Sequence, residues 1–330
     1  MAAIAQAQPN IALVKYWGKR DAALNLPATG SLSITLDAPW TRTRVEFDAS
    51  LRHDELRLNG AEDPAALARV SACLDLLRQR AGTARRARID TRNHFPTAAG
   101  LASSASGFAA LVVAADAALG LGLDRRTLSM LARRGSGSAA RSLFGGFVGL
   151  DAGERDDGTD AIAQPLLDAA AWPLAVVIAV TSHRRKRVGS GVGMERSRRS
   201  SPFYPAWTHS AATDLAAARR AVQARDFAAL AELSEHSCLK MHAVMQSSRP
   251  PLLYWNGATV DCMQRIRALR EDAGEPVFFT VDAGPQVKAV CTPDAAARVA
   301  AALAALPGVE QVLSSRLGEG ARLLDDGETP

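Results

Sequence analysis

The sequence has few cysteines and no long apolar run. Its four cysteines, Cys73, Cys238, Cys262 and Cys291, are widely separated, with no Cys-x-x-Cys pair and no nearby histidine at zinc spacing. This distribution excludes a disulfide framework and a structural zinc site, and we expect reduced, buried thiols. No stretch of 18 or more apolar residues occurs, and the first residues lack the pattern of a signal peptide. We therefore predict a cytoplasmic protein with no membrane partner.

Lysine is scarce among the 39 basic residues: only five occur, and Lys15 and Lys19 both lie within the first 19 residues. The formal charge of +5 could indicate nucleic acid, but 34 acidic residues are interspersed with the basic ones. The basic run HRRKR at 183–187 has no interleaved aromatic residues, which is typical of an exposed loop. His236 and His242 are six residues apart, a spacing that does not suit a metal pair. We expect a small anionic substrate, no nucleic-acid partner and no metal ligands in the chain itself.

A chain of 330 residues exceeds the size at which one hydrophobic core stops growing, so two domains are predicted. We place the two domains at 1–180 and 181–330 and predict that the second is an α+β layer. The fold class predicted for the chain is α/β (α+β). The polar, basic segment 182–201 is predicted to be a loop. Strands are predicted over 11–14, 31–36, 41–47, 87–93, 145–150, 174–181, 277–282 and 287–291, and helices over 63–81, 106–119, 125–134, 207–225, 227–243, 257–271 and 293–305.

A loop of small residues, PTAAGLASSASG at 96–107, runs into an alanine-rich helical pattern. Such a loop leaves backbone N–H groups uncovered at a helix N-terminus, where the helix dipole favours an anion such as a nucleotide triphosphate. No Gly-Lys-Ser/Thr triplet follows, so this is not a Walker A loop. The alternative is a helix start with small residues for close packing. The candidate ATP-binding residues are Ala99, Gly100, Leu101, Ala102, Ser103 and Ser106, with Ser104 beside them.

The segment NIALVKYWGKRD at 10–21 places two lysines and Tyr16 at the end of an apolar strand. Ammonium groups act as compact point charges, so this turn could bind a phosphate or diphosphate. A solvated loop with incidental lysines is the alternative.

Two further segments each present one charged residue at a glycine-containing turn. GSGSAARSLFGG at 135–146 contains Arg141 among small residues, and a guanidinium group there can hold a carboxylate through two parallel hydrogen bonds. FTVDAGP at 279–285 places Asp282 at the end of an apolar strand, where a carboxylate can accept a hydroxyl proton during phosphoryl transfer. The alternatives are an arginine that caps carbonyl groups and an aspartate that initiates a turn.

Together with GSGVGMERS at 189–197 and SPFYPAW at 201–207, these segments resemble the diphosphomevalonate decarboxylase family of the GHMP kinase superfamily, from about residue 8 to 290. The resemblance implies an N-terminal domain with a βαβ phosphate-loop unit, a ferredoxin-like C-terminal domain and an active-site cleft between them. It implies a homodimer that uses ATP and Mg²⁺, the metal being carried by ATP. The implied reaction, in the mevalonate pathway of isoprenoid biosynthesis, converts (R)-5-diphosphomevalonate and ATP to isopentenyl diphosphate, ADP, phosphate and CO₂.

The resemblance also implies roles for individual residues. Asp282 would orient or deprotonate the C3 hydroxyl, while Arg141 and Asn10 would hold the substrate carboxylate. Lys15 would lie close to Asp282 and lower the pKa of that carboxyl group, and Ser104 would belong to the phosphate loop. The implied substrate-binding residues are Tyr16, Trp17, Gly18, Lys19, Ser136, Gly137, Ser138, Ala139, Ala140, Ser190 and Gly191.

Two departures from the family pattern leave alternatives open. Bacterial relatives often carry Ser-Arg where this chain has Ser190-Gly191, so an arginine contact to the diphosphate is missing unless Arg187 or Arg196 replaces it. The family's Pro-x-Asn-x-Ser-Leu-Ser is PATGSLS at 27–33 in this chain, so Thr29, followed by Gly30, stands where the family has an asparagine. The alternatives are the same chemistry on the 5-monophosphate, giving isopentenyl phosphate, and a small-molecule kinase of the superfamily that stops at the phosphorylated alcohol. A non-enzymatic protein that binds anions or nucleic acid is a third class.

Overall fold

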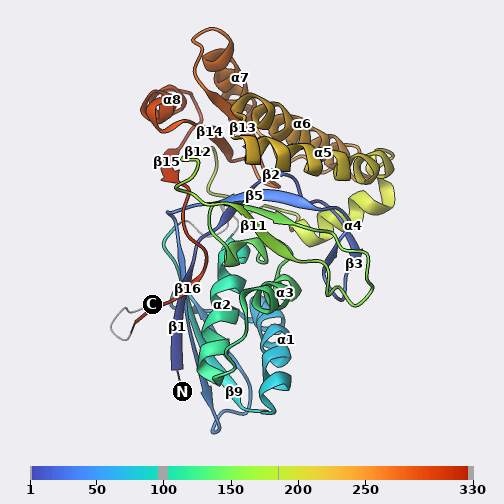
Figure 1. Ribbon diagram of the computed structural model, residues 1–330, viewed down its shortest axis with the longest axis vertical. Helices are drawn as coiled ribbons and strands as arrows, with labels where there is room; N and C mark the ends of the chain where they lie inside the picture. Colours follow the sequence, from blue (N-terminus) through green and yellow to red (C-terminus); the bar gives the residue numbers. More distant parts are fainter. Residues whose placement is uncertain (1, 96–102, 185, 326–330) are drawn as a thin grey trace.

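A six-stranded sheet forms the lower part of the molecule in the computed structural model, which describes residues 2–95, 103–184 and 186–325 (Figure 1). The strand order is β16-β1-β6-β9-β7-β8, and the pairings are antiparallel except that of β7 with β9. Helix α1 (Pro64–Ala81) connects these two parallel strands and so forms a βαβ unit. The strands are β1 (Ala2–Ala7), β6 (Thr41–Asp48), β7 (Glu55–Leu58), β8 (Ala61–Glu62), β9 (Arg86–Asn93) and β16 (Arg322–Leu323).

Local sequence signals account for the helices of this part. The side chain of Asp63 accepts a hydrogen bond from Ala66 N at 3.0 Å at the start of α1, and Gly82 adopts a left-handed conformation at its end. Helix α2 (Ser103–Leu119) is buried on nearly all sides because it packs against β1, β6, α1 and α3 (Arg125–Gly135). Its many alanines allow these elements to approach closely.

A second sheet, in the order β11-β10-β5-β2, lies between the lower and upper parts (Figure 1). Helices α5 (Tyr204–Ala224) and α6 (Phe227–Gln246) pack on it, and their apolar residues share one core with Ile11, Ile34 and Phe147. The strands are β2 (Asn10–Val14), β5 (Ser31–Thr35), β10 (Phe147–Leu150) and β11 (Ala163–Leu167), and a short ribbon of β3 (Lys19–Asp21) and β4 (Leu26–Pro27) follows β2.

A third sheet, in the order β13-β14-β12-β15, is covered on both faces. One set of alternating side chains faces α7 (Gly257–Glu271) and α8 (Ala296–Ala304), while the other joins the core of the second sheet. Strands covered on both faces are expected to be apolar throughout. Thr280 and Lys288 are polar exceptions, and they lie opposite each other across β13 and β14. The strands are β12 (Ala175–Val180), β13 (Val277–Val281), β14 (Val287–Cys291) and β15 (Gln311–Arg316).

The structure confirms the mixed α/β (α+β) class and places the predicted helices and strands to within about three residues at each end. The loop predicted over 182–201 is wrong in its second half, where α4 (Ser190–Ser200) forms. Met194 and Ser197 are buried, and Glu195 pairs with Arg198 at 2.8 Å on the exposed side. The basic composition of the segment concealed this helical pattern. β12 pairs with β14 and β15, so the third sheet starts before residue 180.

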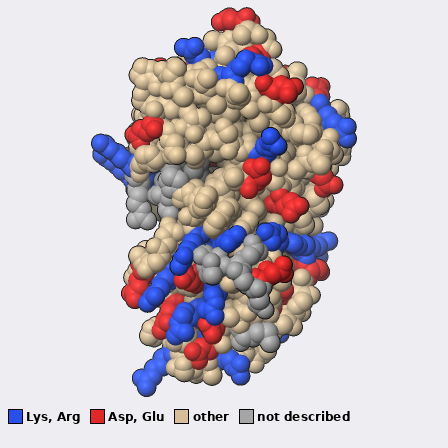
Figure 2. Space-filling model, turned by 90° about the vertical axis from the view of Figure 1, so that its left-hand side faces the viewer, with Lys and Arg blue, Asp and Glu red and all other residues tan. Residues whose placement is uncertain are grey.

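Charged side chains of both signs cover the exposed face of the six-stranded sheet. Buried and partly exposed residues alternate along β6, and Arg44 pairs with Glu46 at 2.7 Å. Arg88 of β9 pairs with Glu55 of β7 at 3.0 Å. Figure 2 likewise shows basic and acidic side chains mixed over the lower part of the visible face. Among the helices of the described part of the chain, none is long and apolar enough to cross a bilayer.

Replacing Asp54 with alanine should strongly destabilise the lower part of the molecule. Asp54 Oδ1 accepts hydrogen bonds from Arg78 Nη2 and from Ala87 N, and both side chains of the ion pair are at most 4% exposed. Removing one partner of a buried pair costs about 3–5 kcal/mol. The remaining pair of Arg78 with the half-exposed Asp75, at 2.7 Å, compensates only part of the charge that is left. Urea unfolding, monitored by circular dichroism, measures the decrease in the free energy of unfolding.

Asp157→Ala, which breaks an exposed pair with Arg155, is the control and should leave the free energy of unfolding unchanged within error. Equal stability of the two variants would show that the buried pair of Asp54 with Arg78 does not stabilise the protein.

Candidate active site

A carboxylate flanked by two lysines lies where the second and third sheets meet. Lys15 follows β2 directly, and its Nζ donates to Asp282 Oδ1 at 2.6 Å. Lys288, on β14, places its Nζ 3.1 Å from Asp282 Oδ2. Both lysine side chains are 1% exposed, whereas the Asp282 side chain is 27% exposed. Thr280 Oγ1 donates to Ala12 O at 3.2 Å and so ties β13 to β2 beside this cluster.

The charges of this cluster determine its protonation. Burial by itself raises the pKa of Asp282, but the ammonium groups of Lys15 and Lys288 outweigh that effect and hold the pKa well below its usual value. Burial lowers the pKa of Lys288, and the Asp282 carboxylate opposes that effect. Asp282 is therefore an ionised hydrogen-bond acceptor at neutral pH.

Arg141 is a buried cation that no carboxylate of the described residues pairs with. It lies in a short 3-10 helix, Arg141–Leu143, and is 2% exposed. Its Nη1 donates to Ser31 Oγ at 2.6 Å, and its Nε donates to Ser33 Oγ at 3.0 Å. Nε and Nη2 also donate to Asn10 Oδ1, at 3.3 and 3.2 Å. A guanidinium group has two hydrogens on each terminal nitrogen, so one N–H on Nη1 and one on Nη2 have no acceptor among the described residues.

The amide of Asn10 is fully used inside the protein. Its Nδ2 donates to Ser138 O at 2.9 Å and to Ser142 Oγ at 2.8 Å, while its Oδ1 accepts from Arg141. Both amide hydrogens are therefore taken. Asn10 is placed to orient Arg141 and the 138–142 turn, rather than to contact a ligand itself.

The predicted phosphate-binding turn after β2 lies beside Arg141. Burial raises the pKa of Tyr16 to about 12, and its hydroxyl is buried with no hydrogen-bond partner in the described part of the chain. The Tyr16 hydroxyl oxygen would lie 2.4 Å from a Cβ placed on Gly137, so the 136–138 turn can approach the phenol only because residue 137 is glycine. Burial also lowers the pKa of Lys19, helped by Arg69. The Tyr16 hydroxyl is thus a buried polar group beside the 136–138 turn that the described residues leave without a partner.

Two residues of this turn serve mainly in packing. Trp17 is 1% exposed and its Nε1 donates to Ser197 Oγ at 3.0 Å. Gly18 has φ of 122° and lies against the Tyr204 ring, so another residue would not fit there. Ala139 and Ala140 are fully buried, and only their backbone groups shape the turn that holds Arg141.

The start of α2 carries hydroxyl groups toward the 136–138 turn. Ser104 Oγ lies 3.2 Å from Ser136 Oγ, which lies 3.4 Å from Ser138 Oγ. Ser106 differs, because it is fully buried and its Oγ lies 2.7 Å from Thr41 Oγ1. Its hydroxyl is thus engaged in the core of the lower part. Ser103 begins the helix, while the predicted residues Ala99, Gly100, Leu101 and Ala102 lie outside the described residues.

The segment before α4 brings a further cation to the same region. Lys186 Nζ donates to Ser190 Oγ at 2.8 Å and to Ala283 O at 3.3 Å, next to Asp282. Ser190 is the first residue of α4, and a side chain on Gly191 would point into open space. Arg196 Nη1 donates to Pro250 O at 3.5 Å on the surface of α4.

Sequence reasoning missed three parts of this site. Lys288 lies in an otherwise apolar strand, so no sequence motif includes it. The scarcity of lysine in this chain was nevertheless a signal that could have drawn attention to it. Ser31 and Ser33 alternate along β5, and that spacing could have indicated two hydroxyls on one face. Arg69 of α1 stacks its guanidinium group 5.0 Å from the Phe108 ring centre, near Lys19. Nothing in the sequence around Arg69 indicates this placement, which depends on how α1 packs.

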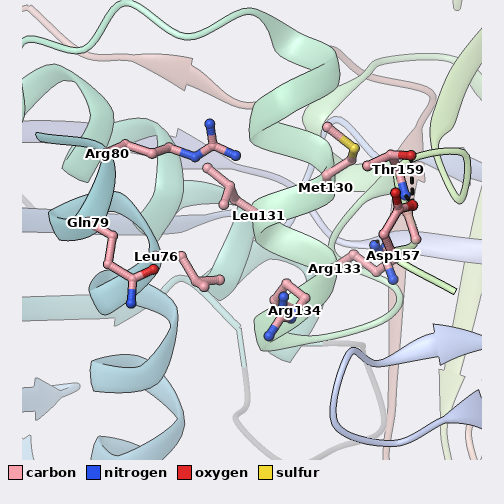
Figure 3. A pocket seen from close by; sticks show the side chains of 10 residues that line it. Leu76, Gln79, Arg80, Met130, Leu131, Arg133, Arg134, Asp157 and Thr159 are labelled. Atoms are coloured by element: carbon pink, nitrogen blue, oxygen red, sulfur yellow. Dashed lines mark hydrogen bonds between the residues drawn. The ribbon is translucent and has the colours of Figure 1, made fainter.

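A separate cavity of about 330 Å³ lies between the C-terminal parts of α1 and α3 (Figure 3). Its lining includes Arg80, Arg133 and Arg134 with Asp157. These arginines occupy the last turns of α1 and α3, where the helix dipole favours cations. Arg133 donates to Leu24 O and to Gly158 O, each at 3.0 Å, so it ties loops to α3. The cavity contains none of the candidate catalytic residues.

Comparisons with known proteins agree with this geometry. The model of the diphosphomevalonate decarboxylase-like N-terminal domain matches residues 7–163, and that of the mevalonate 5-diphosphate decarboxylase C-terminal domain matches residues 176–321. The chain is 40% identical over 295 residues to the diphosphomevalonate decarboxylase of Aspergillus fumigatus, a match that spans 84% of this chain and 73% of that protein.

Solved structures extend the likeness over the whole fold. One, described as MDDEF in complex with MVAPP, AMPPCP and magnesium, has 39% identity and a TM-score of 0.91 over 99% of both chains. The mevalonate diphosphate decarboxylase of Staphylococcus aureus has 38% identity and a TM-score of 0.92 over 98% of both chains. The partly exposed carboxylate with its two buried lysines, and the arginine that no carboxylate of the described residues pairs with, thus occur in a chain that belongs to the diphosphomevalonate decarboxylase family.

Proposed function

We propose that this enzyme catalyses the ATP-dependent decarboxylation of (R)-5-diphosphomevalonate to isopentenyl diphosphate, ADP, phosphate and CO₂. The observation that carries the proposal is Arg141, a buried guanidinium group with one N–H free on each terminal nitrogen and no carboxylate partner among the described residues. A buried, uncompensated cation is costly, so this site is built to receive an anionic group. Asp282, near Arg141 in space, supplies the hydroxyl-facing carboxylate that the reaction also needs.

The residues fit Mg-ATP beside that position. Hydroxyls at the start of α2 and the ammonium of Lys186 suit phosphate oxygens. The described residues contain no group of three His, Cys, Asp or Glu side chains that could hold a metal, so Mg²⁺ would be held chiefly by the nucleotide phosphates. When bound, Mg-ATP supplies the phosphoryl group that makes the C3 oxygen a good leaving group.

The chain's own residues then have distinct tasks. Asp282 accepts a hydrogen bond, and finally the proton, from the C3 hydroxyl, while Lys15 keeps the carboxylate ionised. Arg141 holds the substrate carboxylate so that its electrons flow into the new C=C bond as CO₂ leaves. Asn10 orients Arg141 from behind. Tyr16 and Lys19, with the 136–138 turn and Ser190, bind the phosphate end of the substrate.

The diphosphate is favoured over the monophosphate by the number of cations at that end. Bacterial relatives often carry an arginine at the position of Gly191. In this chain Arg69 supplies a positive charge instead, and it lies close enough to Lys19 to lower the pKa of that lysine. Neither Arg187 nor Arg196 is needed for this account. An anion- or nucleic-acid-binding role has less support, because carboxylates pair with Arg44 and Arg88 on the open sheet face.

The proposal is tested by supplying purified protein with Mg-ATP and either (R)-5-phosphomevalonate or the 5-diphosphate. We expect ADP and CO₂ in equal amounts from the diphosphate, and far slower turnover of the monophosphate. ADP without CO₂ would indicate a kinase, and preference for the monophosphate would move the assignment to the other decarboxylase. Two domains, with the boundary moved from residue 180 to a point before β12 because β12 pairs with β14 and β15, complete the proposal together with a homodimer and a cytoplasmic location. Limited proteolysis, sedimentation and cell fractionation would test them.

A further inference from the structure

Lys288 is the part of the site that neither the motifs nor the proposed mechanism requires. It lies on β14, which pairs with β13, and it faces Thr280 across the two strands. Asp282 follows β13 and starts the turn that leads back to Lys288. Its backbone O accepts from Gly284 N at 2.7 Å, and Gln286 anchors the turn by accepting from Thr181 N at 2.6 Å. One hairpin therefore carries both the carboxylate and a cation for it.

The two lysines hold different oxygens of Asp282. Lys15 reaches Oδ1 at 2.6 Å from the end of β2, and Lys288 lies 3.1 Å from Oδ2. A single cation leaves a carboxylate able to turn about its χ2 bond, a rotation with broad minima. Cations on both oxygens define the plane of the group. The 27% exposure of Asp282 shows that the group still has an open side for a ligand.

A purely structural role does not account for Lys288. At 1% exposure, an ammonium group pays a large desolvation cost, and an apolar side chain of similar length would fill the same space without it. Val287 and Ala289 face the core under α7 and α8. The stem of Lys288 therefore lies on the other face of β14, toward Cys238 and His242 of α6, where an unbranched methionine would be suitable. The role of Lys288 therefore depends on the positive charge of its ammonium group.

We propose that Lys288 is a positioning residue that acts through Asp282, fixing Oδ2 so that the carboxylate is aligned with the substrate hydroxyl. The inference rests on the proposed function, because alignment matters only if Asp282 faces the reacting hydroxyl. Its charge also contributes to keeping Asp282 ionised.

A pH profile can isolate this effect because His242 and Cys238, two buried neighbours of Asp282, do not titrate near neutrality. Burial lowers the pKa of His242 on α6 to about 3 and raises that of Cys238 on the same helix to about 11. Both stay neutral over the usual assay range. The charged groups that face Asp282 are Lys15 after β2, Lys288 on β14, Lys186 before α4 and Arg141 of the 3-10 helix.

The test compares Lys288→Met with Lys240→Met, which removes the only lysine outside the site. We expect Lys288→Met to lower kcat by about 10- to 100-fold, with the KM values for both substrates within about 3-fold of the native values, as for loss of a supporting contact. Because losing a cation raises the pKa of Asp282, the acidic limb of kcat/KM should move to higher pH. In Lys288→Ala, added ethylammonium should restore part of kcat. An unchanged kcat and an unmoved acidic limb in a folded Lys288→Met would overturn the proposal.

Two further measurements keep the test decisive. If Lys288→Met does not fold, Lys288→Arg keeps the charge but displaces it, and native kcat in that variant would contradict positioning. The carboxyl ¹³C resonance of Asp282 in the ligand-free protein should titrate at higher pH in Lys288→Met than in the native protein. That readout needs no turnover. If the native enzyme releases no CO₂, the proposed function fails; if the resonance does not shift, the role of Lys288 fails.

Discussion

Replacing Asp282 with asparagine should reduce turnover by about 10²- to 10⁴-fold, the usual contribution of a positioned proton acceptor. Asparagine keeps the size of the side chain, but it cannot accept the hydroxyl proton. It also removes the negative charge that compensates Lys15 and Lys288, so the pKa of Lys288, which burial already lowers, should fall further. The loss should appear in kcat for ADP and CO₂ together, with little change in the KM for ATP.

Asp214→Asn is the matched control for this substitution. Asp214 of α5 also accepts from a lysine, Lys240 of α6, but that pair is outside the site. The control should retain native kcat, and its folding can be compared by thermal unfolding. Retention of more than about a tenth of native turnover in Asp282→Asn would show that another group takes the proton.

Replacing Arg141 with lysine should lower kcat/KM for the mevalonate substrate by about 10²- to 10³-fold. This corresponds to about 3–4 kcal/mol, a common cost for truncating a buried, hydrogen-bonded charge pair. Lysine keeps the charge but cannot reach Ser31, Ser33 and Asn10 while it presents two parallel N–H groups to a ligand. We also expect less CO₂ than ADP, because a carboxylate that is no longer held directs its electrons less well.

Arg78→Lys serves as the control for a buried arginine away from the reacting groups. Arg78 pairs with Asp54 under the six-stranded sheet, so its loss should lower stability and leave kcat/KM unchanged. If Arg141→Lys shows only the same loss of stability, with native kcat/KM, then Arg141 does not hold the substrate carboxylate.

Local patterns in the sequence carried most of the secondary structure. Helix α1 was predictable because Asp63, Pro64 and Gly82 mark its ends within a few residues. Helix α4 was not, because arginine-rich composition resembles a loop until Met194 and Ser197 are seen to face inward. The segments around Lys15, Arg141 and Asp282 could be picked out because each presents a charged residue at a turn, but each also had a structural alternative that the sequence left open.

The order of amino acids is enough to say which chemical groups this protein has and at which turns they lie. Which of these groups meet depends on folding in three dimensions, because Lys15 and Asp282 are 267 residues apart in the chain and Arg141 and Ser31 are 110 apart. Such contacts depend on the packing of the second and third sheets, which no local pattern encodes. Lys288 shows this most clearly. In sequence it is a polar interruption of an apolar strand, and only the pairing of β13 with β14 places it beside the Asp282 carboxylate.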